Sequence, residues 1–123
     1  MKGKTVLNFL KSLVNVQTLD LEAKLFPAPG CAWGGKGEVE LEAFHNGNAR
    51  MEVEIKHSGI PDGTSVEFVS NGSVIATVTP VGGFIKERYE FSELEPHPEF
   101  AEGDLVEMRI GGQVCYSGTF QRD

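Results

Sequence analysis

Residues 65–79 read SVEFVSNGSVIATVT and carry the clearest structural signal in the chain. The pair Asn71-Gly72 stands between two runs rich in Val, Phe and Ile, and such a pair is the strongest short-range sign of a β-hairpin. Turn-forming residues border the stretch, with Pro61-Asp62-Gly63 before it and Gly82-Gly83 after it. Residues 65–79 are therefore predicted to form two antiparallel strands joined by a tight turn.

A second hairpin with the same pattern follows 40 residues later. Residues 103–115 align without a gap with residues 63–75, so that Gly111-Gly112 falls on Asn71-Gly72. This alignment predicts a hairpin over residues 104–120 and places Cys115 on its apolar face, as a small buried hydrophobic residue. Two interpretations stay open, a true duplication and two hairpins that obey the same turn rules.

Alternation of apolar and polar side chains predicts four further strands, because successive side chains of a strand point to opposite faces of the sheet. These strands cover residues 18–26, 38–44, 50–56 and 84–91. The Gly-rich segment 28–37 and the Pro-containing segment 92–103 are predicted loops. Cys31 lies in the first of these loops, so a disulfide with Cys115 is not expected, although an oxidising compartment would allow one.

The strands at 38–44 and 50–56 are predicted to form a hairpin with one solvated face. A three-residue loop at 46–48 is preferred, because it pairs Ala43 with Met51 and Leu41 with Val53. A register that differs by one residue would place apolar side chains in solvent.

The predicted fold is all-β, an antiparallel β-sandwich or small barrel of about 7–8 strands. Residues 5–16 have apolar side chains that partly fit a helical period, so a short N-terminal helix is expected there, with a strand as the alternative. The chain is expected to be a single β domain over residues 1–123. Residues 1–16 would form the helix or strand, and residues 17–123 the β-sandwich core.

The charge of the chain argues against nucleic acid and membrane surfaces as partners. The formal net charge is −7 and no basic cluster is present, so phosphate backbones and anionic lipids repel the protein. No stretch approaches the ~20 apolar residues that span a bilayer. The apolar run near the N-terminus is broken by Asn8 and Lys11, which leaves it too short for a signal-peptide core. A soluble, cytoplasmic protein is expected.

The two hairpin motifs resemble a loosely defined group of small uncharacterised bacterial β-sandwich domains. The motifs are Asp62-Gly63-Thr64 with Asn71-Gly72, then Gly103-Asp104-Leu105-Val106-Glu107-Met108-Arg109, and finally Ser117-Gly118-Thr119-Phe120. The resemblance covers roughly residues 34–120, and it departs from the group's pattern at residues 101–104, where Ala-Glu-Gly-Asp replaces Ala-Gly-Asp. It implies the β fold and no activity, because the group carries no catalytic motif.

Four glutamates of the first predicted hairpin are candidate metal ligands. In the preferred register Glu42 faces Glu52 and Glu40 faces Glu54, and like charges that face each other destabilise a sheet. A hard cation such as Ca²⁺ would relieve this repulsion through carboxylate oxygens. The alternative is a solvated outer face on which water and salt screen the charges. A register shifted by two residues would instead pair Glu40 with Lys56.

Other candidate residues have simpler explanations. Trp33 in the Gly-rich loop is a candidate binding anchor, and it could equally plug the open end of the fold. The three histidines lack a metal-binding spacing and are expected to be unrelated in space. They are His45, His57 and His97.

The sequence contains no known catalytic fingerprint, so no catalytic residue, no cofactor and no enzymatic activity are expected. The leading expectation is a non-catalytic binding or structural module that acts through contacts with a protein partner or as a homo-oligomer. The alternative is a Ca²⁺-binding β domain that uses Glu40, Glu42, Glu52 and Glu54.

Overall fold

The computed structural model describes residues 17–123, which form eight β-strands and no helix. The segment 5–16, predicted as a helix or strand, lies outside the described residues. Within residues 17–123 no helix could cross a membrane. The strands are β1 (Gln17–Pro27), β2 (Lys36–Phe44), β3 (Ala49–Lys56), β4 (Val66–Ser70), β5 (Ser73–Val78), β6 (Ile85–Phe91), β7 (Leu105–Ile110) and β8 (Gln113–Arg122).

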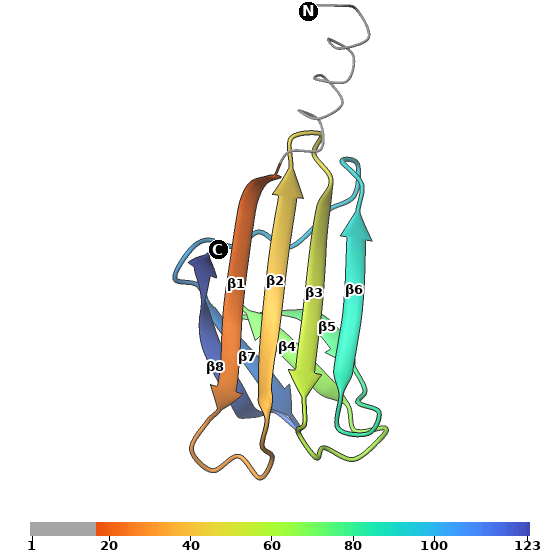
Figure 1. Ribbon diagram of the computed structural model, residues 1–123, viewed down its shortest axis with the longest axis vertical. Coiled ribbons are helices and arrows are strands. Elements are labelled where there is room, and N and C mark those ends of the chain that lie inside the picture. The colour runs from red at the N-terminus through yellow and green to blue at the C-terminus, as the bar shows by residue number, and fades with distance from the viewer. Residues whose placement is uncertain (1–16) are drawn as a thin grey trace, which may run out of the picture.

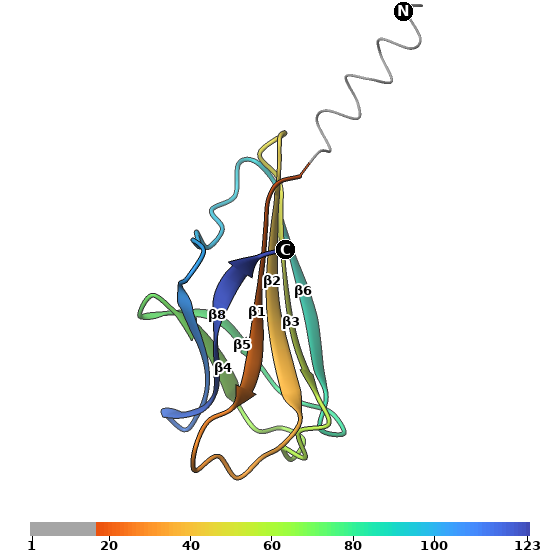
Figure 2. The same cartoon turned by 60° about the vertical axis from the view of Figure 1, so that its left-hand side comes forward.

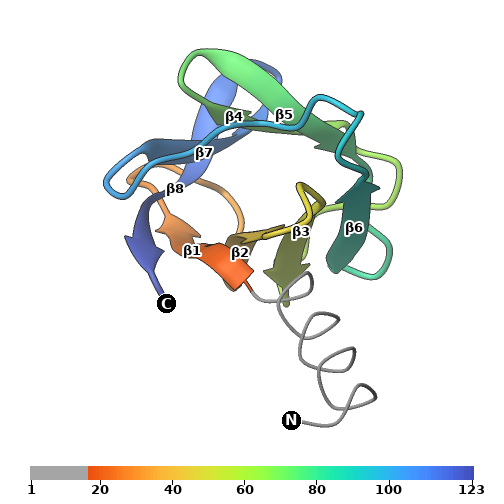
Figure 3. The same ribbon diagram turned by 90° about the horizontal axis from the view of Figure 1, so that it is seen from above.

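All eight strands belong to one antiparallel sheet with the order β5-β4-β7-β8-β1-β2-β3-β6. The sheet curls into a nearly closed barrel, with β5 and β6 at its two free edges (Figure 3). β1, β2, β3 and β6 form one layer, and the strands of the other half cross behind it (Figure 1). The side view separates these two layers (Figure 2). The prediction of an antiparallel β-sandwich or small barrel of about 7–8 strands is confirmed. Of the two alternatives, the structure is the barrel.

β8 joins the two halves of the barrel. Its first part pairs with β7, from Ile110↔Gln113 to Leu105↔Thr119, and its second part pairs with β1 as far as Leu21↔Arg122. The two strands β1 and β8 approach closely at Gly118, where a Cβ atom would overlap the carbonyl oxygen of Lys24. A glycine at this position therefore lets β8 pass from one half of the barrel to the other.

The inner side chains of the strands fill the barrel, as the alternating pattern predicts. Leu21, Val53 and Phe68 come from different strands and are fully buried. The loop 92–104 runs across one end of the barrel, where Phe100 stacks on the buried Phe120 with ring centroids 4.5 Å apart. Cys115 is 6% exposed and belongs to this core, which confirms its predicted burial.

The two predicted tight turns have the same backbone geometry. Asn71 and Gly72 have φ angles of 53° and 75°, and Gly111 and Gly112 have φ angles of 59° and 78°. Two consecutive positive φ angles are characteristic of a type I′ turn, whose twist matches that of antiparallel strands. Both hairpins over residues 65–79 and 104–120 are therefore confirmed.

The repeated hairpins also match in their irregularities. The β4–β5 register shifts between Phe68 and Val69, and the β7–β8 register shifts between Met108 and Arg109, 40 residues later. β4 pairs with β7, and Phe68 lies opposite its equivalent Met108. Antiparallel pairing of equivalent residues relates the two hairpins by an approximate local two-fold axis. This symmetry is consistent with both a duplication and shared turn rules.

The predicted register of the first hairpin is wrong by two residues. The structure pairs Ala43 with Ala49 and Leu41 with Met51. The loop covers residues 45–47 and is closed by the Phe44 N–H, which donates to the Asn48 carbonyl over 2.9 Å. Gly47 has a φ angle of 86°, the left-handed geometry that three-residue hairpin loops require at this position. Both registers bury the same face, so hydrophobic patterning alone did not distinguish them.

Candidate functional site

The outer surface of the β1–β2–β3 layer is strongly acidic. Its side chains alternate with the buried ones and therefore point away from the barrel interior. The chain end that follows β8 adds one more carboxylate, because the Asp123 N–H donates to the Asp20 carbonyl over 3.1 Å. We call this surface the acidic face. It comprises Asp20, Glu22, Glu38, Glu40, Glu42, Glu52, Glu54 and Asp123.

Glu40 lies at the centre of the acidic face. It pairs with Glu22 on β1 and with Glu52 on β3. Its neighbours on the same side of β2 are Glu38 and Glu42. Glu40 is thus surrounded by carboxylates across both neighbouring strands and in both directions along its own strand. A shallow hollow of about 130 Å³ lies beside it, lined by glutamates of β2 and β3.

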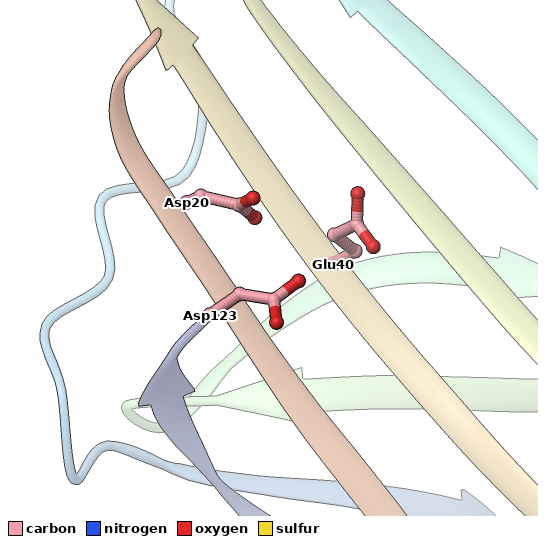
Figure 4. Close-up of side chains that lie close together, drawn as sticks. All are labelled: Asp20, Glu40 and Asp123. Atoms are coloured by element: carbon pink, nitrogen blue, oxygen red, sulfur yellow. The ribbon is translucent and has the colours of Figure 1, made fainter.

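Two groups of three carboxylates are close enough to share one cation. In each group, one oxygen from every residue lies within 4.8 Å of the others. The first group is Asp20, Glu40 and Asp123, which converge from β1, β2 and the end of β8 (Figure 4). The second is Glu22, Glu38 and Glu40. Glu40 is common to both groups, so it is the residue on which a bound cation would depend.

The ion pairs of the acidic face lie at its margin, although Lys24 faces Glu38 and Arg88 faces Glu52 across the neighbouring strands. Glu54 forms ion pairs with Lys56 at 3.2 Å and with Lys86 at 3.6 Å. Arg50 lies across from Glu42 in the β2–β3 register. Among residues 17–123, no lysine or arginine forms an ion pair with the remaining glutamates of the centre, which are Glu22, Glu38, Glu40 and Glu52.

Burial and mutual repulsion raise the pKa of several carboxyls at this centre. Burial, followed by a hydrogen bond with Glu42, raises the pKa of Glu40 to about 8. The pKa of Glu38 is raised by burial and by the charge of Glu22. The pKa of Asp20 is raised by burial and by the charge of Asp123. The folded protein therefore favours a neutralised carboxyl at the centre of the acidic face, either through a proton or through a bound cation.

One carboxylate oxygen of the first group lacks a partner. Asp20 Oδ1 is buried and accepts no hydrogen bond, whereas buried oxygens in folded proteins nearly always have one. This atom belongs to the residue that converges with Glu40 and Asp123. A cation at this place would supply the missing partner.

The raised pKa of Glu40 predicts a pH-dependent stability. In the folded state the pKa of Glu40 is about 8, above its ordinary value of 4.5. The protonated Glu40 side chain therefore makes its full contribution to stability below about pH 4.5. This contribution is lost as the pH rises through 8. Glu40→Gln stays neutral at every pH. Relative to the wild type, we expect its free energy of unfolding to be about 1–2 kcal/mol higher at about pH 9, after allowing for solvent screening, and nearly equal at about pH 5.

Urea denaturation of both proteins at the two pH values measures this difference. A stability difference that does not change with pH would contradict the role of Glu40 as the titrating group.

The predicted metal ligands are only partly brought together. Of Glu40, Glu42, Glu52 and Glu54, only Glu40 belongs to a group that could share a cation. The predicted pairs are wrong, because Glu40 faces Glu52 and Glu42 faces Arg50. The alternative pairing of Glu40 with Lys56 is also wrong, since Lys36 faces Lys56.

Four carboxylates of the two groups were not singled out from the sequence. A usable signal existed for three of them, because Asp20, Glu22 and Glu38 lie on the polar side of alternating strands. The structure pairs Glu22 with Glu40. The fourth is Asp123, which follows β8.

Trp33, His57 and His97 make their contacts outside the acidic face. His45 lies in the loop between β2 and β3. Trp33 is partly buried and packs against the core from the β1–β2 loop. This position agrees better with a side chain that closes the open end of the fold than with an exposed binding anchor. His57 contacts the Phe84 ring, and His97 contacts the Phe91 ring. Among the described residues, no group that could hold a metal ion contains a histidine.

The chain matches no protein-family model and no curated protein. The resemblance inferred from the hairpin motifs therefore stays a prediction, and the residues of the acidic face carry the functional argument.

Proposed function

We propose that this protein is a non-catalytic binding domain whose acidic face holds a hard divalent cation, with Ca²⁺ as the preferred ion. The observation that carries the proposal is the position of Glu40, which has a carboxylate on each of its four sides and belongs to both groups that could share an ion. Like charges that face each other on neighbouring strands destabilise a sheet. A bound cation turns this repulsion into attraction.

The chemistry of the ligands favours Ca²⁺ over other metals. Every candidate ligand is a carboxylate oxygen, which suits hard cations, and neither group contains the histidine or cysteine that softer metals prefer. Ca²⁺ accepts 6–8 oxygens in flexible geometry, whereas Mg²⁺ demands a near-ideal octahedron. Long glutamate side chains on a curved sheet fit the flexible requirement better. The site is open to solvent, so we expect a dissociation constant of about 0.1–1 mM, as in extracellular Ca²⁺ modules.

Thermal unfolding with and without Ca²⁺ tests the proposal. At about 10 mM Ca²⁺ we expect the melting temperature to rise by about 5 °C, because an ion that binds only the folded state stabilises it by mass action. The comparison sample contains NaCl at the same ionic strength, since simple screening would also weaken the repulsion. The expected rise is specific to Ca²⁺, with a smaller effect of Mg²⁺.

Two matched variants locate the effect. Glu40→Gln should remove most of the Ca²⁺-dependent rise. Glu99→Gln removes the same charge from an exposed loop residue outside the acidic face and should keep the full rise. An equal rise in NaCl and CaCl₂, or a full rise in Glu40→Gln, would refute the proposed site.

A role through protein contacts, expected from the sequence, has less support. The exposed large apolar side chains come from β1, β5, β7 and the segments on either side of β6. Single exposed apolar residues are common on protein surfaces. The expectation of a protein partner or homo-oligomer stays a prediction.

A further inference from the structure

The two cysteines of the chain are neighbours in space, although they lie 84 positions apart in sequence. Cys115 is buried on β8, and Cys31 is partly buried in the β1–β2 loop and packs against the same core. The interaction with Cys31 contributes, after burial, to a raised pKa of the Cys115 thiol. Nothing in the sequence indicated this proximity, which arises because the loop folds back onto β8, and both cysteines are free thiols.

Backbone hydrogen bonds hold the two cysteines close together. The Ala28 N–H donates to the Cys115 carbonyl over 2.8 Å, and the Cys31 N–H donates to the Ala28 carbonyl over 3.0 Å. Further along the same loop, the Tyr116 hydroxyl donates to the Gly34 carbonyl. The loop is thus tied to consecutive residues of β8 on both sides of Cys31. This arrangement keeps the two thiols together without any covalent bond.

We propose that Cys31 and Cys115 form a reversible intramolecular disulfide by exchange with a small-molecule disulfide, for example oxidised glutathione. In the first step the Cys31 thiolate attacks the glutathione disulfide, forms a mixed disulfide and releases one glutathione thiolate. In the second step the Cys115 sulfur loses its proton, attacks the Cys31 sulfur and releases the second glutathione. The two protein thiols are oxidised, and one glutathione disulfide is reduced to two thiols.

The surroundings of the two sulfur atoms assign these roles. Cys31 lies nearer to solvent than Cys115, and the Trp33 N–H donates to its Sγ atom over 3.5 Å. Burial and the neighbouring Cys31 raise the pKa of the Cys115 thiol to about 11. Cys115 is therefore a poor initial nucleophile and is shielded from a bulky disulfide. It acts as the resolving thiol, because Cys31 already lies within reach.

The disulfide would fasten the β1–β2 loop to the strand that joins the two halves of the barrel. It would enclose most of the described chain between its two cysteines, and a cross-link over a long loop restricts the unfolded state strongly. Oxidation should therefore raise the melting temperature by about 10 °C.

The test uses the full chain incubated with oxidised glutathione. We expect the loss of both free thiols, a monomer whose mass falls by two hydrogen atoms, and a proteolytic peptide that links Cys31 to Cys115. The higher melting temperature should return to the starting value after reduction with dithiothreitol. Two variants separate the steps. Cys115→Ala should stop at a single glutathione adduct on Cys31, and Cys31→Ser should scarcely react, because the remaining thiol is buried.

Three results would overturn the proposal. They are no reaction of the wild type, a glutathione adduct on the wild type that persists, and a disulfide between two chains. Cys31→Ser changes a loop residue and leaves the core intact, so it keeps the test decisive if Cys115→Ala does not fold.

Discussion

Phe120→Ala is expected to lower the free energy of unfolding by about 3–5 kcal/mol, the range for truncating a buried phenylalanine. Phe120 is fully buried on β8, and its ring stacks on Phe100 at 4.5 Å. The truncation would leave a cavity in the core and would remove the contact that anchors the loop 92–104. Urea denaturation followed by fluorescence or circular dichroism measures the loss.

Phe26→Ala is the matched control for this prediction. Phe26 lies on β1, but its side chain is 57% exposed. The same truncation there should cost no more than about 0.5 kcal/mol. Equal losses at the two positions would show that β8 does not occupy the core as described.

Gly118→Ala is expected to cost about 2–3 kcal/mol, although it adds only one methyl group. The new Cβ atom would overlap the Lys24 carbonyl oxygen and approach the Leu25 side chain. Because the first of these contacts is with backbone, β8 or β1 must shift to relieve it. The variant should therefore weaken the pairing that joins the two halves of the barrel, measurable as a lower urea midpoint and faster amide exchange in β1 and β8.

Gly34→Ala provides the control for Gly118→Ala. A Cβ atom at Gly34 would meet nothing within 4 Å, and this glycine does not have a positive φ angle. Its stability should change by less than about 0.5 kcal/mol. A tolerated Gly118→Ala would contradict the close approach of β8 to β1.

Local signals in the sequence were sufficient for the strands and the tight turns. Asn71-Gly72 and Gly111-Gly112 specify type I′ turns through their backbone freedom, and period-two alternation marks the buried face of each strand. The register of the first hairpin was not specified in this way. The alternation repeats every two residues, so a shift by two residues buries the same face, and the left-handed geometry at Gly47 decides between the registers.

The candidate site depends on pairing between segments far apart in sequence. Glu40 was identified from its own hairpin, but its partners Asp20 and Asp123 reach it only through the β1–β2 and β1–β8 pairings. A loop separates β1 from β2, and most of the chain separates β1 from β8, so no local rule fixes these registers. The contact between Cys31 and Cys115 escaped prediction for the same reason.

A two-dimensional amide NMR titration with Ca²⁺ at constant ionic strength tests the central claim most directly, because it locates the ion. We predict saturable shifts that centre on residues 38–42 and extend to residues 20–22 and to Asp123, and that are absent in Glu40→Gln. Shifts spread over all exposed carboxylates without saturation, or no shifts at millimolar Ca²⁺, would contradict a cation site on the acidic face.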